Sequence, residues 1–307
     1  MVAGQSRSPS VSVLRRALLH VEGEIRWYEP LAPYTSLQVG GPADVLVFPS
    51  DVDDVIRVVR GARMSHLPLM VLGGTNVVIR DKGIRGIVMQ LKPLTQIQEE
   101  PKDMVYAQAG VRLPRLMQFA LGRKLSGMEW AAGIPGTVGG GVVMNAGTRL
   151  GQMQDVLHAV DFVTINGKRK RIEASTLSFL YRKTMLPKGI VIGAWMQLTS
   201  AAKDTIQSAT KQYLQYRKTT QPLTLPNAGS VFKNPTGDSA GRLIEAAGLK
   251  GLQIGDAEVS TKHANFIVNR GTATAEQVLS LVRKVRGKVA RKFGVRLQLE
   301  WKVIGER

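Results

Sequence analysis

The pattern of apolar and polar positions predicts that helices and strands alternate along most of the chain. Apolar residues recur at helical spacing after Ser50, and Ser50 with Asp53 fits a helix-capping box. Two short apolar runs, 67–72 and 77–79, then predict strands. The glycine-rich turn 73–76 lies directly between them. Because a Rossmann dinucleotide motif needs its glycines between a strand and a helix, the pattern argues against that fold.

The rest of the chain continues as a mixture of helices and strands. Helical spacing predicts helices near 114–123, 204–217 and 240–247, and apolar runs predict strands near 156–165, 190–198 and 265–269. The longest uncharged segment, 130–148, contains six glycines and Pro135 and has few large aliphatic side chains. It is therefore interpreted as a buried system of glycine-rich loops rather than as a membrane span.

The C-terminal residues predict one long helix followed by a final strand. Thr274 and Gln277 fit a capping box at the start of the helix, and Gly294 fits its end. In the segment 295–305, alternate residues are apolar, so one face is expected to be buried. Glu300 belongs to the opposite, polar face.

Length and composition indicate a folded protein with more than one domain. The chain has 307 residues, of which 44% are hydrophobic, and single hydrophobic cores rarely grow beyond about 250–300 residues. It contains no cysteine, which excludes disulfides, thiolate nucleophiles and cysteine-ligated metal sites. Arg15 and Arg16 interrupt the apolar patch at 11–21 before a signal peptide could form, so a cytoplasmic protein is expected.

The formal net charge of +19 raises the possibility of a nucleic-acid-binding protein. Residues 261–307 hold eleven Lys or Arg against three Glu, a balance of +8, and much of this charge falls on the predicted C-terminal helix. A solvated helix face is the favoured interpretation. A surface that binds nucleic acid is the alternative.

Three features of the sequence could carry chemistry. Backbone amides of the two glycine clusters, 73–76 and 133–147, could form nests for an anion such as a pyrophosphate, although each cluster could also be a simple tight turn. In the segment 226–235, Gly229 precedes Ser230, and the spacing places Ser230, Phe232 and Asn234 on one face of an extended chain. By composition alone, Arg182 and Glu300 are ordinary surface residues.

A metal site is not expected. The four histidines, His20, His66, His158 and His263, lack the spacing of metal ligands. The sequence also lacks the G-x-S-x-G elbow of a serine hydrolase, so Ser230 is not predicted to be an acyl-transfer nucleophile.

These scattered segments, taken in order, resemble the UDP-N-acetylenolpyruvoylglucosamine reductase family. The resemblance extends from about residue 30 to the C-terminus. The similar segments are YTSLQVGGP at 34–42, VLGGTN at 71–76, GIPGTVGGGVVMNAG at 133–147, the pair Tyr181-Arg182, RKTTQPLTLPNAGSVFKNP at 217–235, AGRLIEAAGLKG at 240–251, VSTKHANFIVN at 259–269 and EWKVIG at 300–305.

The resemblance implies an α+β fold of the vanillyl-alcohol-oxidase-like, PCMH-type FAD-binding class. An N-terminal segment at 1–30 would precede an FAD-binding domain at 31–212, with subdomains at about 31–90 and 91–212. A substrate-binding α+β domain would follow at 213–307. The implied cofactors are noncovalent FAD and NADPH as hydride donor. The implied reaction is the reduction of UDP-N-acetylglucosamine enolpyruvate to UDP-N-acetylmuramate for peptidoglycan synthesis.

The resemblance also implies roles for individual residues. Arg182 and Glu300 would stabilise the developing enolate carboxylate, and Ser230 would protonate the adjacent carbon. Binding of FAD is expected at the residues Gly73, Gly74, Thr75, Asn76, Gly133, Ile134, Pro135, Gly136, Gly139, Gly140 and Asn145. Contacts with the substrate are expected at the residues Tyr181, Arg217, Lys233, Asn234 and His263. No nucleic-acid partner or membrane insertion is implied, and no oligomeric state is predicted.

Some positions depart from the family pattern. Thr75 stands where serine is more usual, and the bulky Trp301 follows Glu300. The spacing near Tyr181 resembles the shorter variety of the family, which lacks an inserted substrate-capping loop. Two alternatives remain at this point: a flavin oxidase of the same fold, and a basic nucleic-acid-binding protein. The oxidase is less favoured because such relatives often tether flavin through cysteine or histidine, and neither occurs in the glycine loops.

Overall fold

The computed structural model describes residues 8–307, which form two compact units. The first unit comprises 8–27, Asp44–Gly73 and Gly86–Gln215, and the second comprises Tyr28–Ala43, Gly74–Arg85 and Tyr216–Arg307. Residues 1–7 of the predicted N-terminal segment lie outside the described residues. The predicted domain boundaries near residues 30, 90 and 212 stay predictions.

The first unit contains most of the secondary structure. Its helices are α1 Val11–Ala17, α2 Val52–Met64, α3 Leu113–Gly122, α4 Val138–Val143 and α5 Lys203–Thr220, which continues into the second unit, with 3-10 turns at Glu129–Ala131, Met153–Asp155 and Ala174–Thr176. Its strands are β1 Glu24–Trp27, β2 Ala43–Phe48, β3 Leu69–Val71, β5 Ile84–Met89, β6 Ile97–Glu100, β7 Met104–Gln108, β8 Leu125–Ser126, β9 Gly147–Thr148, β10 Gly151–Gln152, β11 Leu157–Thr164, β12 Arg169–Glu173, β13 Ser178–Leu180, β14 Lys183–Met185, β15 Gly189–Gln197 and β16 Thr199–Ser200.

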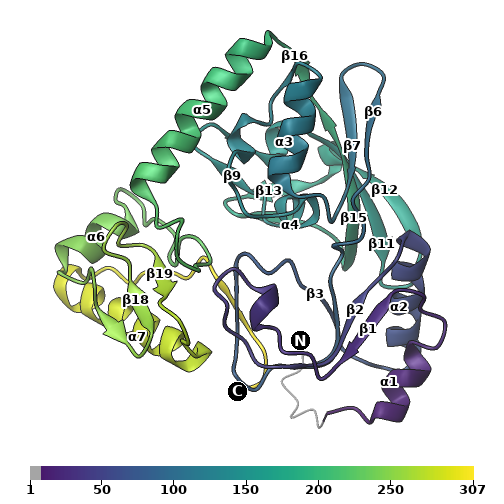
Figure 1. Ribbon diagram of the computed structural model, residues 1–307, viewed down its shortest axis with the longest axis horizontal. Helices are drawn as coiled ribbons and strands as arrows, with labels where there is room; N and C mark the ends of the chain where they lie inside the picture. Colours follow the sequence, from purple (N-terminus) through teal and green to yellow (C-terminus); the bar gives the residue numbers. More distant parts are fainter. Residues whose placement is uncertain (1–7) are drawn as a thin grey trace. The chain divides into compact units, whose positions relative to one another are not determined.

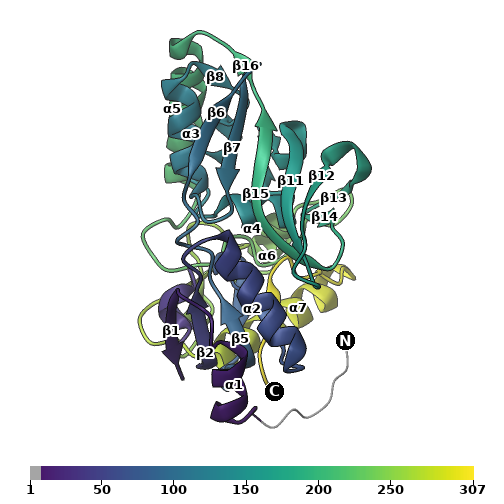
Figure 2. The ribbon, with the colours of Figure 1, turned by 90° about the vertical axis from the view of Figure 1, so that its right-hand side faces the viewer.

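A five-stranded antiparallel sheet dominates this unit, with the strand order β12-β11-β15-β7-β6 (Figure 2). Alternate residues of its strands enter one core together with the apolar faces of α3 and α4. Trp130 and Phe162 are among the largest fully buried side chains there. This packing fixes the glycine-rich segment that contains α4 against the sheet.

A second sheet of the first unit has the order β1-β2-β5-β3, and β3 pairs with β5 in parallel. Its apolar side chains pack with α1 and α2, and Val163, Ile190 and Ile192 from the large sheet join the same core. β3 ends two residues before Gly73. The core therefore fixes the approach to the first glycine-rich turn.

The second unit is built around the two helices α6 Ala240–Ala246 and α7 Ala275–Phe293 (Figure 1). Their apolar faces share a core with the small sheet β17 Gln253–Ile254, β18 Ala257–Val259 and β19 Ile267–Asn269. A parallel pair joins β4 Val77–Ile79 to β20 Lys302–Ile304. A 3-10 turn at Ala32–Tyr34 completes the regular structure.

Two predictions of local structure in the first unit are corrected. The N-cap of α2 is Asp51, which accepts a hydrogen bond from the Asp54 amide, and Ser50 lies before it. The segment 130–148 is not loop throughout, because it contains α4. Helix propensity disfavours glycine, but the Thr137 side chain caps α4 and burial of Val138 and Val142 stabilises it.

The C-terminal predictions are mostly confirmed. Thr274 and Gln277 form the capping box of α7, and Gly294 ends the helix with φ of 71°. The final strand is shorter than predicted, since only Lys302–Ile304 pairs continuously with a neighbour. The expected apolar face of 295–303 nevertheless packs in the core, where Leu297 and Trp301 are buried.

Candidate functional site

The turn 73–76 is attached to the last strand through Asn76. The Asn76 carbonyl accepts a hydrogen bond from the Lys302 amide at 3.1 Å, and the Asn76 side chain donates to the Glu300 carbonyl at 3.2 Å. Gly74 has φ of 81°, and a Cβ there would lie 2.1 Å from the Tyr34 carbonyl oxygen. Only glycine fits this position, so the turn depends on Gly74 for its shape.

The segment that carries Ser230 lies beside Glu300. The Glu300 amide donates to the Val231 carbonyl at 2.9 Å, and the Lys233 amide donates to the Gln298 carbonyl at 2.9 Å. The Trp301 indole donates to the Ala228 carbonyl at 2.9 Å. The second unit therefore brings together Asn76, Glu300 and the backbone next to Ser230, and the bulky Trp301 ties the two segments to each other.

The Ser230 side chain is half-buried and makes no hydrogen bond with any of the residues 8–307. Gly229 before it has φ of 74°, and its amide donates to the Asn227 side chain at 3.1 Å. Val231 and Phe232 are both buried in the same core. The predicted alternation, with Ser230, Phe232 and Asn234 on one face, is therefore wrong, because Phe232 points into the core while Asn234 is exposed.

The other predicted substrate residues are distributed over the second unit. The Asn234 side chain accepts a hydrogen bond from the Ala240 amide at 3.1 Å, next to the start of α6. The Arg217 side chain is buried and donates to Gln221 at 3.0 Å. Lys233 is half-buried. Tyr181, the remaining predicted substrate residue, belongs to the first unit and is 56% exposed.

His263 is held in one protonation state by its surroundings. Burial lowers the pKa of the imidazole below its ordinary value, and the nearby positive charge of Lys250 acts in the same direction. Its Nδ1 accepts a hydrogen bond from the Asn265 amide at 3.2 Å. Both effects favour the neutral imidazole, and an Nδ1 atom that accepts a hydrogen bond leaves the proton of that form on Nε2.

In the first unit, the cluster 133–147 combines a turn with α4. The Gly136 carbonyl accepts a hydrogen bond from the Leu113 amide at 2.9 Å. A Cβ on Gly139 would lie 2.9 Å from the Ala109 Cβ, so this glycine is required by close packing. At Gly73 and Gly140, by contrast, a Cβ would meet no described atom closer than 3.6 Å. These two positions leave the backbone accessible to a ligand.

Asn145 joins this cluster to the hairpin that carries Arg182. Its side-chain amide donates to Gln154 at 2.9 Å and to the Leu180 carbonyl at 3.4 Å. Its carbonyl oxygen accepts from the Gln154 amide at 3.0 Å. The side chain of Asn145, a predicted cofactor residue, is therefore engaged in shaping the loop.

Arg182 lies in the two-residue turn between β13 and β14 and has φ of 57°. Its guanidinium group lies 5.2 Å from the centre of the Tyr181 ring. The neighbouring Thr184 side chain donates to the Val142 carbonyl of α4. The first unit therefore brings Arg182 together with the glycine cluster.

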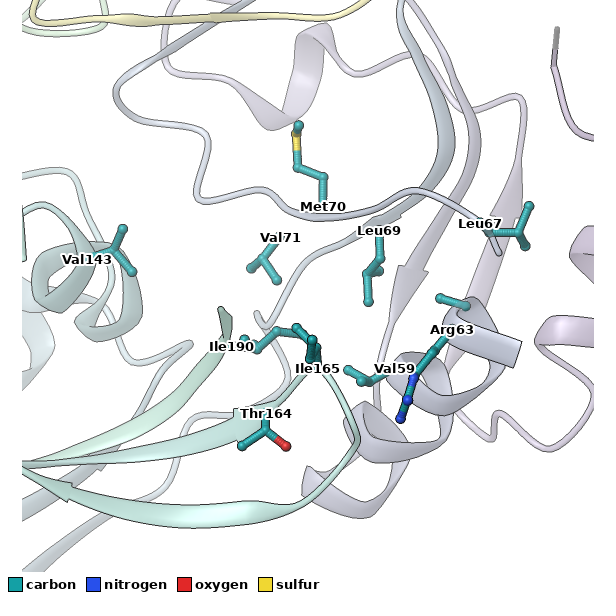
Figure 3. A pocket seen from close by; sticks show the side chains of 12 residues that line it. Val59, Arg63, Leu67, Leu69, Met70, Val71, Val143, Thr164, Ile165 and Ile190 are labelled. Carbon is teal, nitrogen blue, oxygen red and sulfur yellow. The ribbon is translucent and has the colours of Figure 1, made fainter. Parts of the chain in front are cut away.

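An apolar pocket of about 550 Å³ lies in the first unit (Figure 3). Val71, two residues before Gly73, and Val143, two residues before Asn145, both line it. Ile165 and Ile190, from the ends of β11 and β15, line it as well. The sequence gives no indication of this pocket, because its residues come from five segments that look like ordinary core positions.

The pocket and the glycine turns together fit a dinucleotide such as FAD. A pyrophosphate can accept hydrogen bonds from exposed backbone amides at glycine positions, and a flat ring system needs an apolar pocket. Open space beside Gly73 and Gly140 is space that a Cβ would fill. The residues present therefore match the chemistry of the cofactor expected from the sequence.

Residues 8–307 contain no cluster of three or more His, Asp or Glu side chains that could hold a metal ion. Over the same residues, no helix is both long enough and apolar enough to cross a membrane.

Comparisons with known proteins identify the family. Residues 221–304 match the family described as UDP-N-acetylenolpyruvoylglucosamine reductase, C-terminal domain, and residues 43–173 match the FAD binding domain family. UDP-N-acetylenolpyruvoylglucosamine reductase 2 of Symbiobacterium thermophilum is 46% identical over 293 residues, which cover 94% of this chain and 95% of the relative. The reductase of Moorella thermoacetica is 45% identical over 280 residues, which cover 91% and 92%.

A solved structure leads to the same conclusion. The crystal structure of UDP-N-acetylenolpyruvylglucosamine reductase from Thermus caldophilus is 39% identical, with a TM-score of 0.79 over 92% of this chain and 98% of that one. The α+β fold is of the vanillyl-alcohol-oxidase-like, PCMH-type FAD-binding class, with a C-terminal α+β domain. The chain belongs to the UDP-N-acetylenolpyruvoylglucosamine reductase family and is an FAD-dependent oxidoreductase.

Proposed function

We propose that the protein reduces UDP-N-acetylglucosamine enolpyruvate to UDP-N-acetylmuramate in the cytoplasm, with NADPH as the hydride donor and noncovalently bound FAD. The relatives named above support the substrate. The observation that carries the proposal is the hydroxyl group of Ser230. It is free of hydrogen bonds within residues 8–307, on a segment bonded directly to Glu300.

FAD, when bound, supplies reversible two-electron hydride chemistry. Backbone amides at Gly73, Gly74 and the cluster Gly133–Gly140 would hold its pyrophosphate, assisted by the donors Thr75 and Asn76. Ile134 and Pro135 would shape the second turn around it. The apolar pocket at Val71 and Val143 would accept one of its ring systems. Asn145 would contribute by fixing this loop.

The residues proposed as catalytic act on the enolpyruvyl group. Addition of hydride to its methylene carbon moves an electron pair toward the carboxylate. The fork of donors on Arg182 suits that carboxylate, and donors placed where charge develops contribute about 2.7–4 kcal/mol in comparable sites. Glu300 has to carry a proton to donate there. The Ser230 hydroxyl then gives its proton to the adjacent carbon, which completes the reduction of the double bond.

The remaining polar residues suit the nucleotide part of the substrate. Lys233 and Arg217 provide positive charge for a diphosphate, and Asn234 provides an amide donor. His263, with its proton on Nε2, provides one neutral donor. Tyr181 is exposed next to Arg182, where its ring is available for a contact with the substrate.

The two half-reactions test this function separately. The purified protein is expected to show flavin absorbance that NADPH bleaches and the enolpyruvyl sugar nucleotide restores. Acid precipitation should release the flavin into solution. Ser230→Ala should leave bleaching by NADPH nearly unchanged and slow reoxidation by the sugar nucleotide by at least about 100-fold, because a general acid typically contributes 10²–10⁴-fold.

Ser280→Ala is the matched control, since this hydroxyl lies on α7 and bonds to Glu276 at 3.0 Å. Both half-reactions should keep the parent rates in this variant. An equal loss in the two half-reactions of Ser230→Ala would remove Ser230 from the acid role. A parent protein whose reduced flavin is not reoxidised by the sugar nucleotide would refute the proposed substrate.

A further inference from the structure

Asn265 makes an unusual set of hydrogen bonds to the segment that carries Ser230. The side chain is buried, at 3% exposure. Its carbonyl oxygen accepts from the Phe232 amide at 3.0 Å, and its amide group donates to the Phe232 carbonyl at 2.8 Å. Its own backbone carbonyl accepts from the Val231 amide at 2.9 Å. One residue therefore satisfies three backbone groups in the two residues after Ser230.

The Asn265 side chain takes the place of a neighbouring β-strand. In an antiparallel sheet, a residue exchanges both of its backbone bonds with a residue on the neighbouring strand. Here the primary amide of Asn265 presents one acceptor and one donor to Phe232 in place of a peptide group. On the other side, the same segment is bonded to Gln298 and Glu300. The chain after Ser230 is consequently held from both sides.

Ser230 itself has no hydrogen bond from its side chain to the described residues, so its position depends on the backbone that follows it. Gly229, on its other side, is a flexible residue with positive φ. Before Gly229, the Ala228 carbonyl is held by the Trp301 indole, and after Ser230 the first fixed residue is Val231. Within residues 8–307, Asn265 is the only residue whose side chain forms a hydrogen bond with the backbone of Val231 or Phe232.

We propose that Asn265 is a positioning residue for catalysis, which fixes the Ser230 hydroxyl at the place where the proton is delivered. This inference rests on the proposed function. It assigns to Asn265 no contact with substrate or cofactor. A displacement of about 1 Å in a reacting group can cost about 100-fold in rate, so loss of this clamp should reduce proton delivery strongly.

Asn265→Asp and Asn265→Ala separate this role from general stability. Aspartate keeps the volume and the acceptor for the Phe232 amide, but its ionised form faces the Phe232 carbonyl without a donor. Alanine removes both bonds. We expect reoxidation of the reduced flavin by the enolpyruvyl sugar nucleotide to slow by about 10- to 100-fold in both variants. Bleaching of the flavin by NADPH should change by less than about twofold.

The pH dependence of the reoxidation rate in Asn265→Asp distinguishes a positioning role from a purely structural one. A protonated aspartic acid offers one donor and one acceptor, as the asparagine amide does. Relative to the parent protein at the same pH, the reoxidation rate of Asn265→Asp should therefore recover as the pH falls. Asn265→Ala has no such group and should show no recovery.

Asn269 is the matched control within the same unit. It is equally buried, its amide donates to the Leu37 carbonyl at 3.1 Å, and its oxygen accepts from the Gly271 and Ala273 amides at 2.9 and 3.1 Å. Asn269→Asp and Asn269→Ala remove comparable bonds away from Ser230. They should lower thermal stability to a similar extent and leave the ratio of the two half-reaction rates unchanged.

Hydrogen exchange of backbone amides tests the clamp without any turnover. In apoprotein, the Phe232 amide should exchange faster in Asn265→Asp and Asn265→Ala than in the parent, and keep its protection in the Asn269 variants. Equal loss of both half-reactions, or normal reoxidation with an unprotected Phe232 amide, would overturn the positioning role. Failure of the parent protein to use the sugar nucleotide would instead count against the proposed function.

Discussion

A half-buried imidazole supports the residue that clamps the Ser230 segment. The His263 Nδ1 accepts a hydrogen bond from the Asn265 amide, and this requires the neutral imidazole. Protonation would turn the acceptor into a donor that faces another N–H group. Hydrogen bonds thus connect His263, a titratable residue, through Asn265 to the Phe232 backbone close to Ser230.

This link predicts a dependence of stability on pH. Because burial lowers the pKa of His263 in the folded protein, the unfolded chain binds a proton first as the pH falls below about 6.5. The free energy of unfolding should therefore decrease from about pH 6.5 down to the pKa of the folded state, and this contribution is fully present above about pH 6.5. Urea denaturation at a series of pH values measures it.

His263→Asn tests the assignment, because the asparagine oxygen can accept the Asn265 amide without titrating. This variant should lose the part of the slope that belongs to His263. His158→Asn, which removes a histidine from the first unit, is the control and should keep that slope. The same slope in the parent and in His263→Asn would contradict the role of His263.

Single residues also mark the limit of what the sequence can predict. Ser230, Glu300 and Arg182 are identified only by resemblance, and no pattern in the sequence predicts the bond between the Glu300 amide and the Val231 carbonyl. Nothing in the sequence pattern indicates the role of Asn265. Its bonds reach 33 positions back along the chain and use a side chain in place of a strand, so neither periodicity nor spacing reveals them.

The elements predicted best are those whose ends are determined by residues close by in the sequence. The capping box and terminal glycine of α7 are contained in a few neighbouring residues, and both are confirmed. α4 was missed because its stability comes from tertiary packing, such as the contact of Gly139 with Ala109, which overrides poor helix propensity. The last strand was predicted too long. Residues 295–301 pack like a strand, but only isolated hydrogen bonds pair them with residues 226–235.

The ends of several elements form the apolar pocket, and this leads to a prediction about cofactor binding. Val71 at the end of β3 is 40% exposed. Val71→Trp should fill part of the 550 Å³ pocket and lower the flavin retained by the protein at least about tenfold. The ratio of flavin to protein absorbance after gel filtration measures this retention.

Leu214→Trp is the control, since Leu214 lies on α5 with 41% exposure and does not line the pocket. It introduces the same indole side chain without entering the cavity, so its flavin content should match the parent. Equal flavin content in both variants would show that the cofactor does not use this pocket.

The charge of the whole molecule carries its own expectation. A net charge of +19 attracts anions, and both NADPH and a nucleotide sugar are anionic. The kcat/KM values for both should therefore fall several-fold between about 0.01 and 0.5 M salt, as the Debye length shrinks from about 30 Å to a few ångströms. Steady-state kinetics with a noncoordinating salt measures this effect.

Substitutions in a basic stripe on α7 test which part of the surface attracts the anionic substrates. Lys284, Lys288 and Arg291 are exposed on one side of this helix. Replacing all three by glutamine should flatten the salt dependence if the stripe steers anions to the protein. A kcat/KM that does not change with salt would contradict steering, and the charge would then act only on solubility.

The second unit is assembled from three stretches of chain, and β4 finds its partner β20 only at the far C-terminus. During translation, Val78 and Leu37 leave the ribosome long before α6 and α7, the helices that share their core. A nascent or prematurely terminated chain therefore lacks a formed turn at 74–76. Under the proposed function, binding of FAD at that turn therefore has to follow synthesis of β20, which makes flavin loading sensitive to C-terminal truncation.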